Sequence, residues 1–396
     1  MQLFTGLEYL MIDIANHYGM DKMLWDERLD WVNAHEANLE DFLMKAEEPA
    51  LFYASVNALR EVQKGNPIGF PIALDATCSG CQILSALARD MKAAKLCNVL
   101  NTGKRENMYK HILNKMNQYT SAGAKAQYVD VKKSIMTSLY GSTAKPIEVF
   151  GEDLFEVFKK VMSEEMPDVW ELNEYFLKIW NPKATQYSWV LPDNFHVIIK
   201  VKDKVKKTIR FMDKNYEFYV KEQKPVKVGR SLSANTVHSI DGYFVREISR
   251  RCMYSPEKIR KVQEILKADC EPKNSRGTKM VKTLWDLYQK TGMLSIRICD
   301  YLNEGNKHLV DAQVVLDLID TLPKKPFELI TIHDSFRCLP NYGNDIRRQY
   351  TNMLAELAKS NMLNYLLTSI TGKRHHLVLG NNNMYQDVLN AEYALS

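Results

Sequence analysis

The spacing of apolar residues predicts helices over most of the chain. In the first 60 residues, apolar positions recur three or four residues apart, with polar side chains between them. They are Leu7, Leu10, Met11, Ile14 and Ala15, followed by Leu29, Trp31, Val32 and Leu39. The same spacing recurs over 91–127 and over 252–322, where a polar loop from Asp269 to Arg276 separates two helical stretches.

Two short apolar runs have the length and composition of buried strands. The first, Phe70 to Leu74, ends at Asp75, and the second, Phe327 to Ile332, leads into the turn His333-Asp334-Ser335. Each strand is therefore expected to carry a carboxylate where it meets a turn. Small residues follow Asp75, and an amphipathic helix is expected after them, with Ile83, Leu84, Leu87 and Ala88 on its apolar side.

The segment 195–230 has the pattern of a basic hairpin. Apolar and charged residues alternate on both sides of Asp213-Lys214-Asn215, and eleven Lys or Arg stand against four Asp or Glu. A basic hairpin with aromatic residues suits contact with nucleic-acid phosphates and bases. The candidate contact residues are Lys206, Lys207, Arg210 and Lys214.

Composition sets broad limits. The chain has 396 residues, 45% of them hydrophobic and 26% charged, which is ordinary for a soluble globular protein with one large or two to three smaller domains. No apolar run approaches the ~20 residues of a membrane span, and the start lacks the basic region of a secretory signal. Seven cysteines favour a reducing compartment, and the pair Cys78 and Cys81 is interpreted as packing rather than as a zinc or redox site.

A third stretch adds candidate chemistry. If Val129 to Tyr140 is a helix, Lys132, Met136 and Tyr140 lie on one face, with Lys132 and Tyr140 roughly 12 Å apart. Such a face suits the phosphates and the sugar of one nucleotide. An isolated strand-end Asp is more often a turn residue, and an isolated helix Lys is usually a surface residue, so the three stretches matter only together.

Together, these stretches resemble the motifs of the single-subunit RNA polymerases of phages and mitochondria. The matching residues are Asp75, Ser79, Gly80 and Gln82 in motif A, Lys132, Tyr140 and Gly141 in motif B, and His333, Asp334 and Ser335 in motif C. A fourth motif lies between the last two, at Asn235, His238, Ser239, Asp241 and Gly242. Four motifs in the family's order make the resemblance specific, and it runs from near Tyr9 to the last residue.

The resemblance implies an α+β, right-hand polymerase fold, largely helical with a small antiparallel palm sheet. We expect a helical region at 1–60 on the palm edge, palm at 61–92, fingers at 93–237 with the basic hairpin, and palm again at 238–396. A helical insertion is expected at about 252–322. The family's N-terminal domain, its thumb and a short Arg-containing palm motif have no counterpart here.

The resemblance also implies the site. Asp75 and Asp334 would bind two Mg²⁺ ions, with the backbone carbonyl of Ala76 as a further ligand. Lys132, helped by Lys133, would hold the triphosphate of an incoming rNTP, and Tyr140, Gly141 and His238 would favour ribose. In the family an Arg precedes the motif B Lys by four residues. Here that position is Tyr128, and Lys125 or Lys133 is expected to substitute.

The expected function is DNA-directed RNA synthesis, with DNA template, nascent RNA and rNTPs as partners. The chain resembles the larger, C-terminal subunit of a split two-subunit phage enzyme, which implies a second subunit and the cytoplasm of a host cell, without secretion or membrane contact. The C-terminal tail, with Tyr393, resembles a segment that ends near the active site, so an extension beyond Ser396 is expected to harm activity.

Two alternatives stay open. A DNA polymerase of the same superfamily usually carries a Glu after the motif A Asp and a Glu in place of Ser335, and this chain has neither. A non-catalytic nucleic-acid-binding subunit is disfavoured because Asp75, Asp334, Lys132 and Tyr140 are all present.

Overall fold

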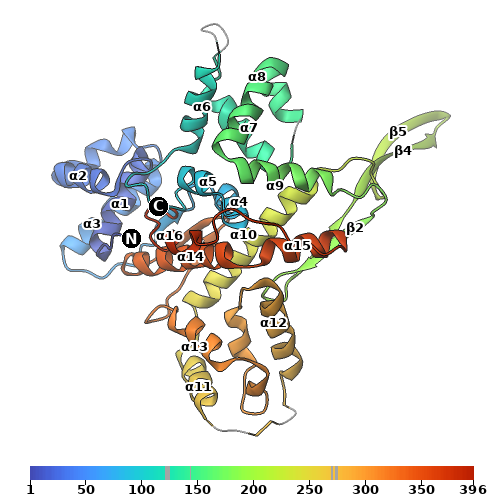
Figure 1. Ribbon diagram of the computed structural model, residues 1–396. Coiled ribbons are helices and arrows are strands. Elements are labelled where there is room, and N and C mark those ends of the chain that lie inside the picture. Colours follow the sequence, from blue (N-terminus) through green and yellow to red (C-terminus); the bar gives the residue numbers. More distant parts are fainter. Residues whose placement is uncertain (121–124, 143, 269–270, 273–274) are drawn as a thin grey trace.

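The chain folds into a helix-rich α+β structure with three small antiparallel sheets (Figure 1). The computed structural model describes residues 1–120, 125–142, 144–268, 271–272 and 275–396. Part of the polar loop expected at 269–276 lies outside these residues. No helix in the described ranges is long and apolar enough to cross a membrane.

The central sheet joins the two strands that the sequence predicts. Strand β1 (Ile72–Asp75) pairs with β7 (Ser335–Cys338), which pairs in turn with β6 (Ile330–Ile332). One face of this sheet, with Leu74 and Phe336, is buried. The strands are shorter than the apolar runs, because Phe327 and Leu329 are buried in the core outside the ladder.

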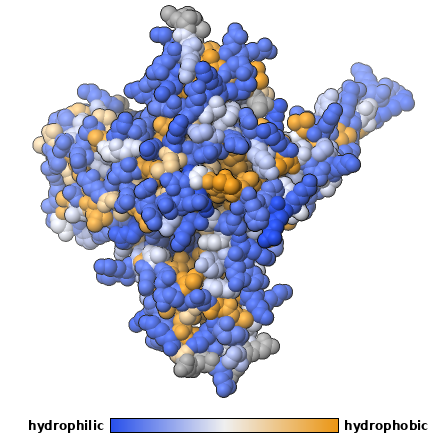
Figure 2. Space-filling model, in the orientation of Figure 1, coloured by the Kyte–Doolittle hydropathy of each residue, from blue (hydrophilic) through white to orange (hydrophobic). Residues whose placement is uncertain are grey.

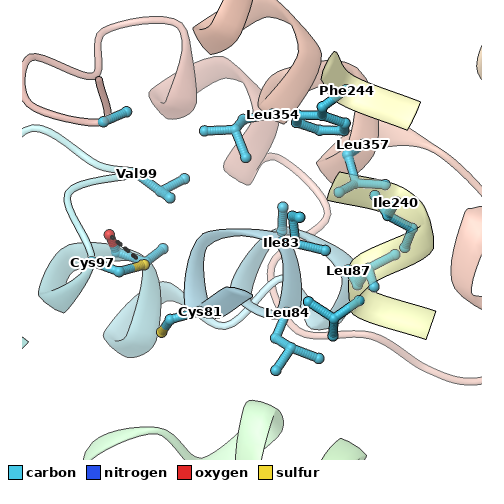
Figure 3. Packing of buried hydrophobic residues seen from close by; sticks show 14 of the residues in the cluster. Cys81, Ile83, Leu84, Leu87, Cys97, Val99, Ile240, Phe244, Leu354 and Leu357 are labelled. Atoms are coloured by element: carbon cyan, nitrogen blue, oxygen red, sulfur yellow. Dashed lines mark hydrogen bonds between the residues drawn. The ribbon is translucent and has the colours of Figure 1, made fainter. Parts of the chain in front are cut away.

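Three helices cover the buried face of the sheet. They are α4 (Ser79–Ala88), α10 (Ser231–Cys252) and α14 (Gly343–Lys359). In Figure 3, Ile83 and Leu87 of α4 lie among Ile240 and Phe244 of α10 and Leu354 and Leu357 of α14. The helix expected after Asp75 is confirmed as α4, but its expected polar, solvent-facing side is wrong: all ten residues are buried, because α4 packs against neighbours that its own pattern does not reveal.

The first 60 residues are helical, as predicted, and have a small core of their own. Two of these helices, α1 and α3, also contact each other directly, and α1 contacts β1. The elements are α1 (Gly6–Ala15), η1 (Asn16–Met20), α2 (Trp25–His35), η2 (Glu36–Lys45) and α3 (Pro49–Gln63).

Helices and two hairpins fill the region between β1 and α10. The helices are α5 (Met91–Leu96), α6 (Met108–Gln118), α7 (Tyr128–Leu139), α8 (Ala144–Glu165) and α9 (Pro167–Lys178). One hairpin joins β2 (Gln186–Val190) to β3 (His196–Lys200), and the other joins β4 (Lys202–Phe211) to β5 (Lys214–Gln223). The β4–β5 hairpin projects from the body as a mostly hydrophilic arm (Figures 1 and 2).

The segment expected as an insertion forms a separate helical module with its own hydrophobic core, from Ile259 to Ile319. It lies beside the central helices in Figure 1. Its elements are α11 (Pro256–Lys267), α12 (Thr278–Thr291), η3 (Ile296–Asp300), η4 (Lys307–Leu309) and α13 (Ala312–Asp320). The chain then returns to the sheet and ends through η5 (Pro340–Tyr342), α14, α15 (Met362–Thr371) and α16 (Met384–Val388).

Candidate active site

The pairing of β1 with β7 brings the two candidate carboxylates to the same end of the central sheet. Asp75 lies opposite Ser335 in the register, and the backbone N–H of Ala76 donates to the carbonyl oxygen of Asp334 at 3.2 Å. Asp334 and His333 form the two-residue turn between β6 and β7. Residues 259 positions apart in sequence therefore meet through main-chain pairing, which fixes the positions of their backbones.

The charges at this end of the sheet influence one another. Partial removal from water and the nearby Asp334 together raise the pKa of Asp75, against a hydrogen bond from Ser335 that lowers it. Burial, with a further contribution from Asp334, raises the pKa of Asp241 on α10 to about 6. Asp334 thus lies close enough to repel both Asp75 and Asp241, an arrangement that a bound cation stabilises.

The last residues of the sequence form one wall of the site. Ser396 exchanges backbone hydrogen bonds with Asp75, at 2.9 and 3.4 Å, and Thr77 N–H donates to the carbonyl of Ala394 at 3.3 Å. The Gln82 side chain also donates to the carbonyl of Ala394, at 2.9 Å. Tyr393 does not face the site: its ring stacks on Trp25, and its hydroxyl accepts a hydrogen bond from the backbone N–H of Trp25 at 3.2 Å.

A cavity of about 400 Å³ opens beside Asp75. Asp75, Ala76 and Lys132 line it, and Tyr128, the first residue of α7, lies in its wall. The Lys132 ammonium lies 5.7 Å from the centre of the Tyr109 ring, a cation–π arrangement that leaves its hydrogen-bond donors available. The sequence-predicted metal and phosphate residues of motifs A and B therefore face one space.

Tyr140 and His238 form a second contact, outside the lining of this cavity. Their ring centroids are 4.8 Å apart, and burial raises the pKa of the Tyr140 hydroxyl to about 12. That hydroxyl lies only 2.7 Å from the position that a Cβ on Gly80 would take. Gly80, Tyr140 and His238 thus meet, although Tyr140 itself is the residue after the end of α7 rather than part of the helix.

Two groups of predicted residues lie elsewhere. Lys133 is exposed, and both Lys133 and Lys125 lie outside the lining of this cavity, so their expected substitution for the Arg that Tyr128 replaces stays a prediction. The hairpin residues lie on the projecting arm (Figure 1), where Lys206 pairs with Glu217 at 2.7 Å. Lys207 and Arg210 form similar exposed pairs with Glu222 and Asp213, at 2.7 and 2.8 Å.

Sequence reasoning missed a buried polar network beside β1. Asp13 accepts from the backbone N–H of Ala73 at 3.0 Å and binds His17 at 3.1 Å, while Glu48 binds the other ring nitrogen of His17 at 3.0 Å. Burial opposes the charged imidazole, but the hydrogen bonds to Asp13 and Glu48 outweigh it and raise the pKa of His17. The available signal was a pair of polar residues, four apart, on an otherwise apolar helix.

Asp75, Asp334 and the backbone carbonyl of Ala76 are the candidate oxygen ligands for Mg²⁺. No group of three or more His, Cys, Asp or Glu that could hold a metal occurs among the described residues. Mg²⁺ does not require one, because it is commonly bound by one or two carboxylates together with waters and substrate phosphates. Asp75, Asp334 and the carbonyl of Ala76 therefore fit Mg²⁺ in the presence of a phosphate ligand.

Comparison with known proteins points to one class. Residues 4–181 match the family described as DNA-dependent RNA polymerase. The chain is 27% identical over 215 residues to a probable DNA-directed RNA polymerase of Gelasinospora sp. (strain G114), covering 48% of this chain and 25% of that protein. It is 32% identical over 163 residues to a probable DNA-directed RNA polymerase of Neurospora crassa, covering 36% of this chain and 18% of that protein.

A phage relative shows the same similarity. The DNA-directed RNA polymerase of Pseudomonas phage phiKMV is 28% identical over 179 residues, or 36% of this chain and 22% of that protein. The matches to these three relatives thus cover a quarter or less of each protein's length. The family match includes Asp75, Lys132 and Tyr140 and ends before His238 and Asp334. The family and the relatives are RNA polymerases, which are nucleotidyltransferases.

Proposed function

We propose that this chain carries the catalytic site of a DNA-directed RNA polymerase and transfers ribonucleotides to the 3′ end of an RNA on a DNA template. The observation that carries the proposal is the pairing of β1 with β7, which joins Asp334 to Asp75, and Asp75 lines the same cavity as Lys132 whereas Asp334 lies outside its lining. The similarity of residues 4–181 to RNA polymerases supports the same chemistry.

The proposal gives the metal-binding and phosphate-binding residues the following roles. Asp75, Asp334 and the carbonyl of Ala76 would hold Mg²⁺, which in a two-ion arrangement stabilises the attacking and leaving oxygens of a phosphoryl transfer. Lys132, in the lining of the same cavity as Asp75, would neutralise charge on the triphosphate and protonate the departing pyrophosphate.

The Tyr140–His238 contact is assigned to the sugar. The rings of Tyr140 and His238 lie 4.8 Å apart between centroids, and Gly80 packs against the Tyr140 hydroxyl. The hydroxyl and the imidazole are the hydrogen-bonding groups that would contact the sugar. A site built to hydrogen-bond a substrate hydroxyl rejects the analogue that lacks it, because its own polar group is then left unpaired. This pair therefore favours ribonucleotides, and Gly141 allows the turn that follows Tyr140.

The whole enzyme is proposed to have two subunits. The chain supplies the palm and fingers of a right-hand polymerase, and a second subunit supplies the thumb and N-terminal part, as in a split phage enzyme working in the cytoplasm of its host. A DNA polymerase is the rival, and the relatives' names favour RNA synthesis.

Primer extension tests the proposal. An RNA primer annealed to a DNA template is incubated with the chain and Mg²⁺, with rNTPs or dNTPs, with and without a candidate second subunit. Extension with rNTPs is expected. Preference for dNTPs would contradict the roles of Tyr140 and His238, and scaffold binding without extension under every condition would favour a non-catalytic subunit.

A further inference from the structure

Two arginines line the cavity beside Asp75 without a carboxylate partner. Among the described residues, neither Arg105 nor Arg337 forms an ion pair, although both are only partly exposed. Arg105 uses one donor, its Nε, which donates to the Ser396 hydroxyl at 3.3 Å. A guanidinium has five donors, so most of this group is available to a ligand.

Arg337 is the more unusual of the two. It lies on β7 opposite Ala73, two residues after Ser335, so its side chain is on the same face of the sheet as Asp75. Its Nε is buried, and no described residue accepts a hydrogen bond from it. A buried donor on a charged group without an acceptor is costly, which indicates that an anion completes the site.

The carboxylates around the cavity do not fill this role: most of them already have partners, and Asp75 attracts Arg337 by its charge without accepting a hydrogen bond from it. Asp13 is bound by Ala73 and His17, and Glu48 is bound by His17. Asp21 and Glu106 lie 3.7 and 3.4 Å from the ammonium groups of Lys22 and Lys104. Burial lowers the pKa of Arg105 and the charge of Asp21 partly offsets this, but Asp21 forms no hydrogen bond with it.

We propose that Arg105 and Arg337 form a phosphate-binding site in this cavity and hold the triphosphate of the incoming nucleotide together with Lys132. The assignment rests on the proposed function. Arg105 then supplies the guanidinium that Tyr128 does not, from the segment before α6 rather than from α7. Two guanidinium groups and one ammonium bind phosphate oxygens through charge-assisted hydrogen bonds, which are the stronger kind.

The test is binding of inorganic tripolyphosphate to the full chain, measured by calorimetry in EDTA so that Asp75 and Asp334 do not contribute through a cation. Arg105→Ala and Arg337→Ala are each expected to weaken binding roughly tenfold or more. The matched controls Lys110→Ala and Arg348→Ala remove exposed cations outside the cavity and should leave affinity unchanged. Arg105→Lys and Arg337→Lys keep the charge and should recover part of the affinity.

A stability measurement separates a binding role from a structural one. Because the buried Nε of Arg337 has no acceptor, Arg337→Met should unfold, without ligand, at the same temperature as the parent chain or above it. A large loss of stability would overturn the assignment. So would unchanged tripolyphosphate affinity in both alanine variants, or weaker binding of an RNA–DNA scaffold alone, which would place nucleic-acid phosphate there instead. These outcomes do not depend on catalysis, so absence of extension would count against the proposed function only.

Discussion

Gly141, directly after Tyr140, has a backbone conformation that other residues adopt only with strain. Its φ is +83°, and an added Cβ would lie 2.5 Å from the carbonyl oxygen of Arg230. Gly141→Ala should therefore lower the free energy of unfolding by the left-handed strain of about 1–2 kcal/mol and by a further steric cost of about 1–3 kcal/mol. Urea denaturation monitored by circular dichroism measures the loss.

Gly103 provides the matched control for this substitution. Its φ is +77°, but nothing lies within 4 Å of the added Cβ, so Gly103→Ala should show the strain cost alone. Equal losses in the two variants would mean that the close approach of Arg230 does not constrain the turn after α7.

At the scale of residues, the sequence predicts the site residues whose spacing identifies a motif. It does not predict the residues that reach the site only because distant segments fold together. Asp75 and Lys132 were predicted from short patterns and line one cavity. Arg105 and Arg337 lie in no motif, and their lack of ion-pair partners appears only when the distant segments around them are placed. Lys133, expected beside Lys132 at the phosphates, lies outside the cavity lining, because adjacent residues of a helix point in different directions.

At the scale of elements, the Asp13–His17–Glu48 network makes the packing of α1 on β1 sensitive to pH. The pKa of His17 is raised in the folded chain above its ordinary value of 6.5, so the folded state binds the proton more tightly than the unfolded state. Its contribution to stability is complete below about pH 6.5 and is lost as the pH rises through the folded-state pKa. The difference in unfolding free energy between the parent chain and His17→Gln should shrink over that range.

The exposed His376 gives the comparison, since His376→Gln should leave the pH dependence of stability as it is in the parent chain. A difference between the parent and His17→Gln that stays constant from pH 6 to pH 8 would show that the network does not hold a proton.

A buried ion pair joins α10 to the helical module and to α14. Arg251 donates to Glu247 at 3.2 Å and to Glu356 at 2.6 Å, and Glu247 also accepts from Ser295 and from the Ile296 N–H. Arg251→Leu would remove the guanidinium that donates to the buried Glu247 and leave it two neutral donors and Arg250 at 3.6 Å, which should cost about 3 kcal/mol in chemical denaturation. Arg348→Leu, which removes an exposed guanidinium, should change stability by about 0.5 kcal/mol or less.

The elements also show where periodicity stops being informative. Helices at 1–60 and a hairpin within 195–230 follow from their patterns, because each has one solvent-facing side or alternates clearly. The full burial of α4 did not follow, since a pattern within one helix does not report the neighbours that cover its polar side. The hairpin turn falls at Met212 and Asp213, one residue earlier than expected, where both residues adopt positive φ.

At the scale of the whole molecule, the β4–β5 hairpin is the extension best placed to reach nucleic acid beyond the cavity (Figure 2). Replacing Lys206, Lys207 and Arg210 with Ala should lower the magnitude of the slope of log affinity against log salt by up to about 3, if each contacts one phosphate. Their present ion pairs are exposed and cost little to exchange for phosphate. Fluorescence anisotropy with labelled DNA at several salt concentrations measures the slope.

A triple variant at Lys64, Lys178 and Arg348, all changed to Ala, removes the same number of exposed, ion-paired cations from other surfaces. It should keep the slope of the parent chain. A slope that is unchanged in the hairpin variant as well would show that the arm does not contact phosphate.

Contacts between distant segments of the chain could be predicted only where the order of the motifs implied them. The order of the motifs placed Asp75 and Asp334 together, and the register of β1 with β7 provides the physical link. The docking of the module at 252–322 through Glu247, and the cavity wall formed by Ser396, depend on contacts between segments that no local pattern connects.

The central claim is that Asp75 and Asp334 together perform ribonucleotide transfer. The most direct test is single-nucleotide extension of an RNA primer on DNA, with Mg²⁺ and the required subunits, by the parent chain and by Asp75→Asn and Asp334→Asn. Each variant should keep the circular dichroism and scaffold affinity of the parent and lose extension by a factor of about 10³ or more. Extension by Asp334→Asn at a rate near that of the parent chain would contradict the account.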